Sequence, residues 1–173
     1  ELFLDCFYKL KKSIKNLFFI IIPRHLSRVN DIIKIFNEKG IAFNYRDDAK
    51  SKIEDCSPLI VNSMGELGLF FKLSEIAVVG GSFSKKGGHN PIETRSFSCS
   101  VIFGPHMENF KEIRDLIIEN NAGFEVKNLD GLIEKLNTVL KNKKLNQQTN
   151  KNFKKLCFSL SSKSRNQLKS LLK

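Results

Sequence analysis

Four of the chain's ten glycines fall in one stretch, VVGGSFSKKGGHNPIE, at residues 78–93. The pairs Gly80–Gly81 and Gly87–Gly88 each permit a tight turn, because glycine adopts backbone dihedrals that other residues avoid. Such turns free backbone amides, and a helix beginning at Asn90 would add those of its first turn. The pattern favours a phosphate-binding loop over a merely flexible connection, although it is neither G-x-G-x-x-G nor a GK[S/T] loop. The candidate phosphate loop comprises Gly80, Gly81, Ser82, Gly87, Gly88 and His89.

Glu93 lies one turn into the helix expected from Asn90. A carboxylate at this place can accept hydrogen bonds from both hydroxyls of a ribose. It can equally close the helix N-terminus, because Asn90 is a good capping residue, Pro91 suits the first turn and a glutamate at the third position reaches back to the cap. Both roles are compatible with the sequence.

Two further segments carry groups that suit a nucleotide. Met64, Gly65, Glu66 and Leu67 open a predicted helix and would expose a second set of amides. Glu66 can accept hydrogen bonds from a sugar or base, or it is an ordinary first-turn acid that favours the helix dipole. Arg24 follows Pro23 at the end of an apolar run, where it is either a bidentate phosphate ligand or a surface arginine.

The sequence predicts no metal site and no cofactor. The three histidines, His25, His89 and His106, form no pair at helical i, i+4 spacing, and we expect them to donate hydrogen bonds or shape loops. The four cysteines form no C-x-x-C pair, and none lies at zinc-ligand spacing from a histidine.

The elements that must position these groups alternate along the chain. Short apolar runs predict strands at residues 16–22, 41–45, 58–62, 75–81, 100–104 and 122–126. Helical patterns occur at residues 2–12, 27–40, 64–74, 109–120 and 129–141, from Asn90 onward, and in the tail. This alternation predicts an α/β fold with a Rossmann-like parallel sheet and helices on both faces. Ligands bind such sheets beyond the carboxyl ends of the strands, where the segments above lie.

The positive charge is concentrated at one end. The net charge is +11, and residues 141–173 hold ten Lys or Arg and no Asp or Glu, which leaves +1 for residues 1–140. We therefore expect a Rossmann-like nucleotide-binding domain at 1–140 and a basic helical tail at 141–173, packed on the domain or extending it. The tail suits an anionic membrane surface or is a solvated helical face, and it carries no RNA-binding signature, so no nucleic-acid partner is expected. The longest strongly apolar run, residues 17–22, is far shorter than the roughly 20 residues of a membrane span.

Four motifs, PRHLSR, NSMGELGLFF, VVGGSFSKKGGHNPIE and FGPHMENFKEI, occur in this order. With them the chain resembles, over about residues 17–126, the C-terminal domain of the 3-deoxy-D-manno-octulosonic acid (Kdo) transferases of lipopolysaccharide assembly. The resemblance implies the C-terminal half of a GT-B glycosyltransferase, which moves Kdo from CMP-Kdo to lipid A precursor without a metal, at the cytoplasmic side of the bacterial inner membrane. The CMP-binding residues implied in this way are Pro23, Arg24, Met64, Gly65, Glu66, Leu67, Asn90, Pro91, Ile92 and Glu93.

The chain departs from the family pattern, and one departure, Thr94-Arg95 in place of the common Pro-Ala after Glu93, is tolerable on a helix. Asn62-Ser63 stands where the family usually has Asp-Thr before MGEL, so an amide replaces a carboxylate. The family's acceptor domain, with its catalytic carboxylate and membrane anchor, has no counterpart in these 173 residues, so no catalytic residue is expected here. The resemblance thus implies a donor-binding half that needs an N-terminal half to work. The alternatives are a non-catalytic remnant that binds CMP or nothing, and a basic surface-binding module acting through the tail.

Overall fold

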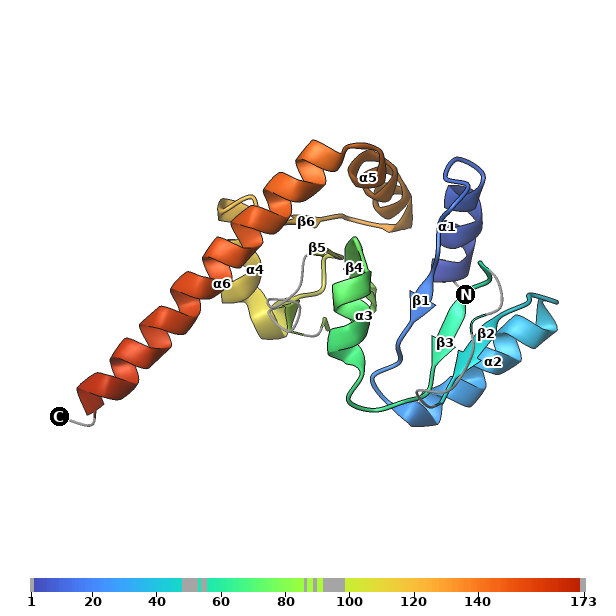
Figure 1. Ribbon diagram of the computed structural model, residues 1–173, viewed down its shortest axis with the longest axis horizontal. Coiled ribbons are helices and arrows are strands. Elements are labelled where there is room, and N and C mark those ends of the chain that lie inside the picture. Colours follow the sequence, from blue (N-terminus) through green and yellow to red (C-terminus); the bar gives the residue numbers. More distant parts are fainter. Residues whose placement is uncertain are drawn as a thin grey trace. The chain divides into compact units, whose positions relative to one another are not determined.

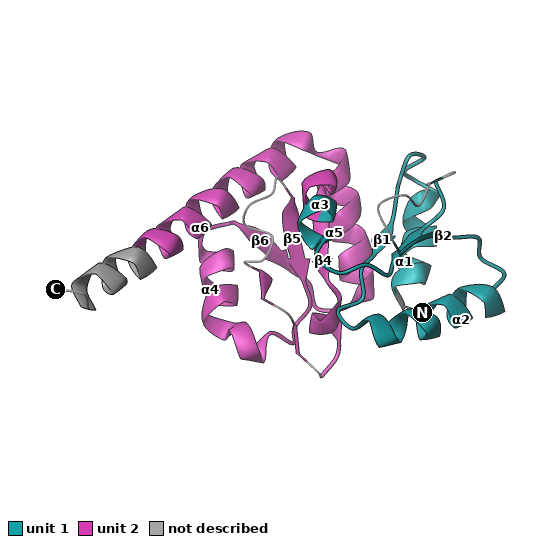
Figure 2. Cartoon of the chain, turned by 60° about the horizontal axis from the view of Figure 1, so that its bottom comes forward, with its two compact units in different colours: residues 1–70 teal, residues 71–173 magenta. Residues whose placement is uncertain are grey.

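The computed structural model describes residues 2–47, 53, 56–85, 87, 88, 90, 91 and 99–171; for residues 2 and 163–171 it describes the backbone alone. The chain forms two compact units, Glu1–Phe70 and Phe71–Lys173 (Figure 2). Each unit holds one three-stranded sheet, and every strand pair in both sheets is parallel. The fold class is therefore α/β with parallel sheets, as the alternation of elements predicts.

The first unit has its strands in the order β1-β3-β2 (Figure 1). Its elements are α1 (Leu2–Lys11), β1 (Ile20–Ile21), the 3-10 helix η1 (Leu26–Arg28), α2 (Val29–Glu38), β2 (Asn44–Arg46), β3 (Leu59–Val61) and the start of α3 (Leu67–Leu73). The central strand β3 is fully buried, as a strand that pairs on both sides should be.

The two faces of this sheet pack against different helices. Successive residues of a strand point to opposite faces, so Ile60 faces one side while its neighbours face the other. One face carries the buried cluster Leu4, Val29, Phe36 and Ile60, from α1, α2 and β3. The other carries Leu59, Val61 and Phe70, from β3 and α3. Helices thus cover both faces of the first sheet.

The second unit has the strand order β4-β5-β6 (Figure 1). Its elements are β4 (Ile76–Val79), the 3-10 helix η2 (Gly80–Phe83), β5 (Ser100–Phe103), the 3-10 helix η4 (Glu108–Phe110), α4 (Lys111–Glu119), β6 (Gly123–Glu125), α5 (Leu129–Lys141) and α6 (Lys143–Leu171). Asn128 caps α5, because its side chain accepts a hydrogen bond from the Gly131 amide at 2.9 Å.

Most of the basic tail forms one helix, α6, and the first half of this helix belongs to the core of the second unit. Phe153, Leu156 and Cys157 of α6 are buried against Val101 and Phe103 of β5, in a cluster that also contains Ile117 of α4. The Ser100 hydroxyl donates to Asn146 Oδ1 at 2.6 Å, which ties α6 to the start of β5. The tail therefore packs on the strands rather than only extending from them.

Apart from the helix expected from Asn90, the expected elements are present, with differences at their ends. Only Ile20–Ile21 of the apolar run 16–22 form β1, and residues 41–43 precede β2 without joining it. The helix expected from Asn90 lies outside the described residues, since 92–98 are not among them. The domain boundaries at 1–140 and 141–173 stay a prediction beside the two units found here.

Candidate nucleotide-binding site

The glycine loop after β4 is braced by a buried serine. Ser82 is 0% exposed; its hydroxyl donates to the Val79 carbonyl at 2.5 Å and accepts from the Gly104 amide at 2.6 Å. The segment after β4 is thereby fixed to the segment after β5. The Ser82 hydroxyl thus bonds to two backbone groups of the protein, and its structural role is to shape the loop. Phosphate binding by Ser82 stays a prediction, and it would use the backbone amide rather than the hydroxyl.

The same two segments are joined again through His106. Its amide donates to the Ser82 carbonyl at 3.0 Å, and its carbonyl accepts from the Gly88 amide at 2.8 Å. Such close approach leaves no space for side chains: a Cβ on Gly88 would lie 2.1 Å from Met107 Sδ. Gly87 has a φ of 81°, which favours glycine for its backbone conformation. The glycines of this stretch thus let two loops pack at the carboxyl ends of adjacent parallel strands.

Replacing Gly104 with alanine is expected to destabilise the chain by about 1–3 kcal/mol, the usual cost of forcing an extra methyl into a packed site. The added Cβ would meet the Ser82 carbonyl oxygen at 2.6 Å and the Phe83 ring at 3.0 Å, and backbone atoms cannot move aside cheaply. Urea denaturation measures the change. Gly131→Ala is the control, because its Cβ has its nearest neighbour at 3.5 Å and lies in α5, so alanine should be neutral or stabilising. Equal stabilities of the parent and Gly104→Ala would contradict the close approach.

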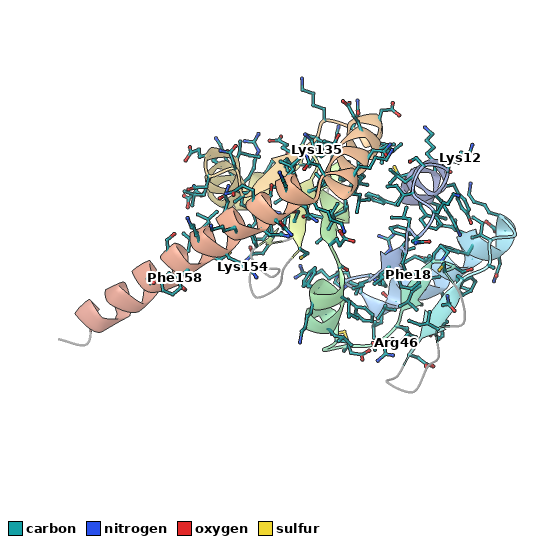
Figure 3. All side chains as sticks on the ribbon, turned by 45° about the horizontal axis from the view of Figure 1, so that its top comes forward. Lys12, Phe18, Arg46, Lys135, Lys154 and Phe158 are labelled. Carbon is teal, nitrogen blue, oxygen red and sulfur yellow. The ribbon has the colours of Figure 1, made fainter. Side chains whose placement is uncertain are left out.

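The loop after β3 is held by a carboxylate with two partners. Arg46 is the last residue of β2 (Figure 3). Its guanidinium donates twice to the carboxylate of Glu66, from Nη2 to Oε1 at 2.6 Å and from Nε to Oε2 at 3.1 Å. The Ser63 hydroxyl donates to Oε2 of the same carboxylate. The hydrogen bonds from Arg46 and then Ser63 lower the pKa of Glu66 to about 2, so this carboxylate is ionised at neutral pH.

Asn62 and Ser63 form the start of this turn. The Asn62 side-chain amide donates to the Tyr45 hydroxyl at 2.6 Å, and Ser63 keeps a hydroxyl that reaches Glu66. Gly65 has a φ of 83°, and the neighbouring Met64 side chain is 75% exposed. The turn from Asn62 to Glu66 is therefore well defined and presents its middle residues to solvent.

The structure brings the sequence-predicted residues of each unit to one sheet edge. Pro23 and Arg24 follow β1 and residues 62–66 follow β3; these strands are parallel neighbours, so their carboxyl ends lie together. Pro23 is half-buried and Arg24 is exposed. In the second unit, the glycine loop after β4 and the segment 104–107 after β5 share an edge in the same way.

The last part of the predicted site is only partly described. Asn90 is half-buried and Pro91 is buried, whereas His89, Ile92 and Glu93 lie outside the described residues. The Nδ1 atom of His106 lies 3.2 Å from Oε1 of Glu108. Among the residues that the structure describes, no three His, Cys, Asp or Glu side chains are grouped to hold a metal ion.

Arg46 is a residue that the sequence reasoning missed. The available signal was its position at the end of a short strand, directly before a polar segment. That signal is weak, because a charged residue at a strand end is usually solvated.

Comparison with known proteins identifies relatives of this chain. No protein-family model matches the chain. The chain is 34% identical over 141 residues to the 3-deoxy-D-manno-octulosonic acid transferase of Rickettsia conorii, covering 82% of this chain and 30% of that protein. It is 33% identical over 144 residues to the same enzyme of Aquifex aeolicus, covering 83% of this chain and 39% of that protein. The chain thus spans about a third of the length of these curated relatives.

A solved structure extends the likeness to the fold. The C-terminal CMP-Kdo binding domain of WaaA from Acinetobacter baumannii superposes with a TM-score of 0.80 at 26% identity, covering 88% of this chain and 80% of that one. The fold is that of the C-terminal domain of a GT-B glycosyltransferase. Within that class, the chain is a relative of the Kdo transferases, and it matches their C-terminal domain.

Proposed function

We propose that this chain is the donor-binding half of a glycosyltransferase that transfers Kdo from CMP-Kdo to a lipid A precursor in lipopolysaccharide biosynthesis. The observation that carries the proposal is the pairing of two features. The loops that follow β1, β3 and β4 hold the residues expected to bind CMP. The fold is similar to that of the C-terminal CMP-Kdo binding domain of WaaA. The acceptor would bind the N-terminal half, which falls outside these residues.

The chemistry proposed for this half is stabilisation of the leaving nucleotide. When the sugar departs, negative charge develops on the CMP phosphate. Fixed donors that point at this charge lower the barrier, because they need no reorganisation during the reaction. Arg24 would supply such a donor. The base that takes the acceptor proton would come from the N-terminal half, so no catalytic residue is assigned to this chain.

The isolated chain is expected to bind CMP without a metal and to transfer no Kdo. Calorimetric titration with CMP, repeated in EDTA, measures the first part, and a transfer assay with CMP-Kdo and lipid acceptor measures the second. An affinity that falls more than about tenfold in EDTA, roughly 1.4 kcal/mol, would contradict metal-free binding. Efficient transfer by the chain alone would overturn the assignment of catalysis to the other half. Absence of CMP binding would favour a non-catalytic remnant.

A second surface suits the anionic lipids at the cytoplasmic face of the inner membrane, where we propose that the chain works. The exposed face of α6 carries four lysines and one aromatic residue, which we call the basic stripe: Lys144, Lys151, Lys154, Lys155 and Phe158. Phe158 is 75% exposed, although the buried Leu156 and Cys157 lie next to it on the same helix (Figure 3). Lysines around an exposed aromatic ring match a negatively charged lipid surface. No described helix is long and apolar enough to cross a membrane.

Replacing Lys151 and Lys155 with glutamine is expected to weaken binding to phosphatidylglycerol vesicles at low salt by about tenfold, since each lysine near an anionic surface contributes up to about 1 kcal/mol. Vesicle sedimentation measures the change. The control replaces Lys111 and Lys127 with glutamine. Both lysines are also exposed, so this variant loses the same charge outside the stripe. Equal losses in the two variants would show that net charge, rather than this face, governs the binding.

A further inference from the structure

Arg46 holds both ends of the turn that joins β3 to α3. Its carbonyl accepts from the Asn62 amide at 2.6 Å, at the start of the turn. Its guanidinium forms the bidentate pair with Glu66, at the end of the turn, with the shorter contact at 2.6 Å. The side chains of the pair are 13% and 22% exposed, so solvent competes only partly for their hydrogen bonds. One residue of β2 thereby sets the separation of the two ends of a five-residue turn.

The turn between these contacts has free backbone donors. In the described part of the chain, the amides of Gly65, Glu66 and Leu67 donate to no protein acceptor. A backbone amide without a protein acceptor still needs a hydrogen-bond partner, which water or a polar ligand can supply. Glu66 would oppose an anion here if its charge were uncompensated. The guanidinium of Arg46 cancels that charge and keeps the carboxylate on the side of β2.

We propose that Arg46 is a positioning residue for nucleotide binding, which fixes the turn 62–66 and neutralises Glu66 beside a phosphate-bearing ligand. The inference rests on the proposed function, because it needs CMP to be the ligand of this edge. It assigns to Glu66 an indirect role, through its pair with Arg46, in addition to any contact of its own with the nucleotide.

Arg46→Gln is expected to weaken CMP binding about five- to tenfold and to weaken cytidine binding less, because the unpaired Glu66 carboxylate then repels the phosphate. The double variant Arg46→Gln with Glu66→Gln removes the repelling charge and is expected to recover part of the lost affinity for CMP. Loss of fold stability would not produce such a recovery, so the double variant separates positioning from a merely structural role. Calorimetric titration of each variant with CMP and with cytidine gives these comparisons.

The matched control is Arg114→Gln in the second unit. Arg114 donates to one oxygen of Glu125, Oε2, through Nε at 2.9 Å and Nη2 at 2.5 Å, so this variant breaks another arginine–glutamate pair, away from the turn. It is expected to lower the melting temperature and leave the affinity for CMP unchanged. If Arg46→Gln does not fold, Arg46→Lys keeps the charge but loses the fork, and a folded Arg46→Lys must still bind CMP more weakly than the parent.

The outcomes separate this inference from the proposed function. A parent chain that binds no CMP overturns the proposed function, and this inference with it. A parent that binds CMP, beside a folded Arg46→Gln or Arg46→Lys variant with the same affinity, overturns the positioning role alone. A double variant that binds no better than Arg46→Gln also overturns it, because the effect would then not pass through the charge of Glu66.

Discussion

Arg24→Gln is expected to weaken CMP binding about 10- to 100-fold and to leave cytidine binding within about twofold of the parent. A hydrogen bond to a charged group contributes about 1.5–3 kcal/mol, and each 1.4 kcal/mol is a factor of ten in affinity. Arg24 is exposed at the carboxyl edge of β1, next to the turn after β3, where a guanidinium can reach a phosphate. Titration of both ligands separates phosphate contact from contact with the nucleoside.

The matched control for this prediction is Arg28→Gln. Arg28 is the last residue of η1, is also exposed, and lies four residues after Arg24. The Arg28→Gln variant loses the same charge from the same segment, but no motif places Arg28 at the nucleotide. Equal losses in the two variants would mean that the phosphate responds only to the local positive potential. An unchanged affinity in Arg24→Gln would remove Arg24 from the site.

The elements of the fold were predictable because each has a strong local signal. Val29, Ile32, Ile33 and Phe36 recur at helical spacing, and they form α2 with Val29 and Phe36 in the core. Strand ends were harder. The run 16–22 is apolar throughout, yet only Ile20–Ile21 pair with β3, because pairing depends on a partner that the sequence does not identify. The apolar strands also differ in burial, which their sequences do not reveal. Strands β3 and β5 are fully buried, whereas β1 and β4 are half-buried because, among the described residues, β1 and β4 each pair with a strand on one side only.

The site was predictable as a set of loops but not as a set of contacts. Segments that follow neighbouring parallel strands meet at one edge of their sheet, so the motifs around Arg24 and Glu66 could be placed at such an edge before any coordinates, and the glycine loop could be placed at another. A serine in a glycine-rich loop can bind a phosphate or brace the loop, and only the partners of Ser82 reveal the second role. Likewise, nothing in the sequence pairs Arg46 with Glu66, which lie twenty residues apart.

Glu93→Gln is expected to weaken CMP binding by about 1.5–3 kcal/mol, or about 10- to 100-fold, and to leave the melting temperature within a few degrees of the parent. The basis is the sequence, since Glu93 lies outside the described residues. A carboxylate one turn after Asn90 can accept hydrogen bonds from both ribose hydroxyls, and a glutamine there can still close the helix N-terminus. The variant should therefore lose the ligand contact and keep the cap.

The comparison of CMP with 2′,3′-dideoxy-CMP decides between the two roles of Glu93. If the carboxylate binds the ribose, the parent prefers CMP and Glu93→Gln discriminates poorly, because the hydroxyls no longer find a charged acceptor. Glu112→Gln is the matched control: Glu112 lies in the first turn of α4, so its loss reports the helix-dipole effect alone, which is at most about 1 kcal/mol of stability at an exposed site. A Glu93→Gln variant with a lowered melting temperature and an unchanged preference for CMP would assign Glu93 to the helix cap and remove it from the site.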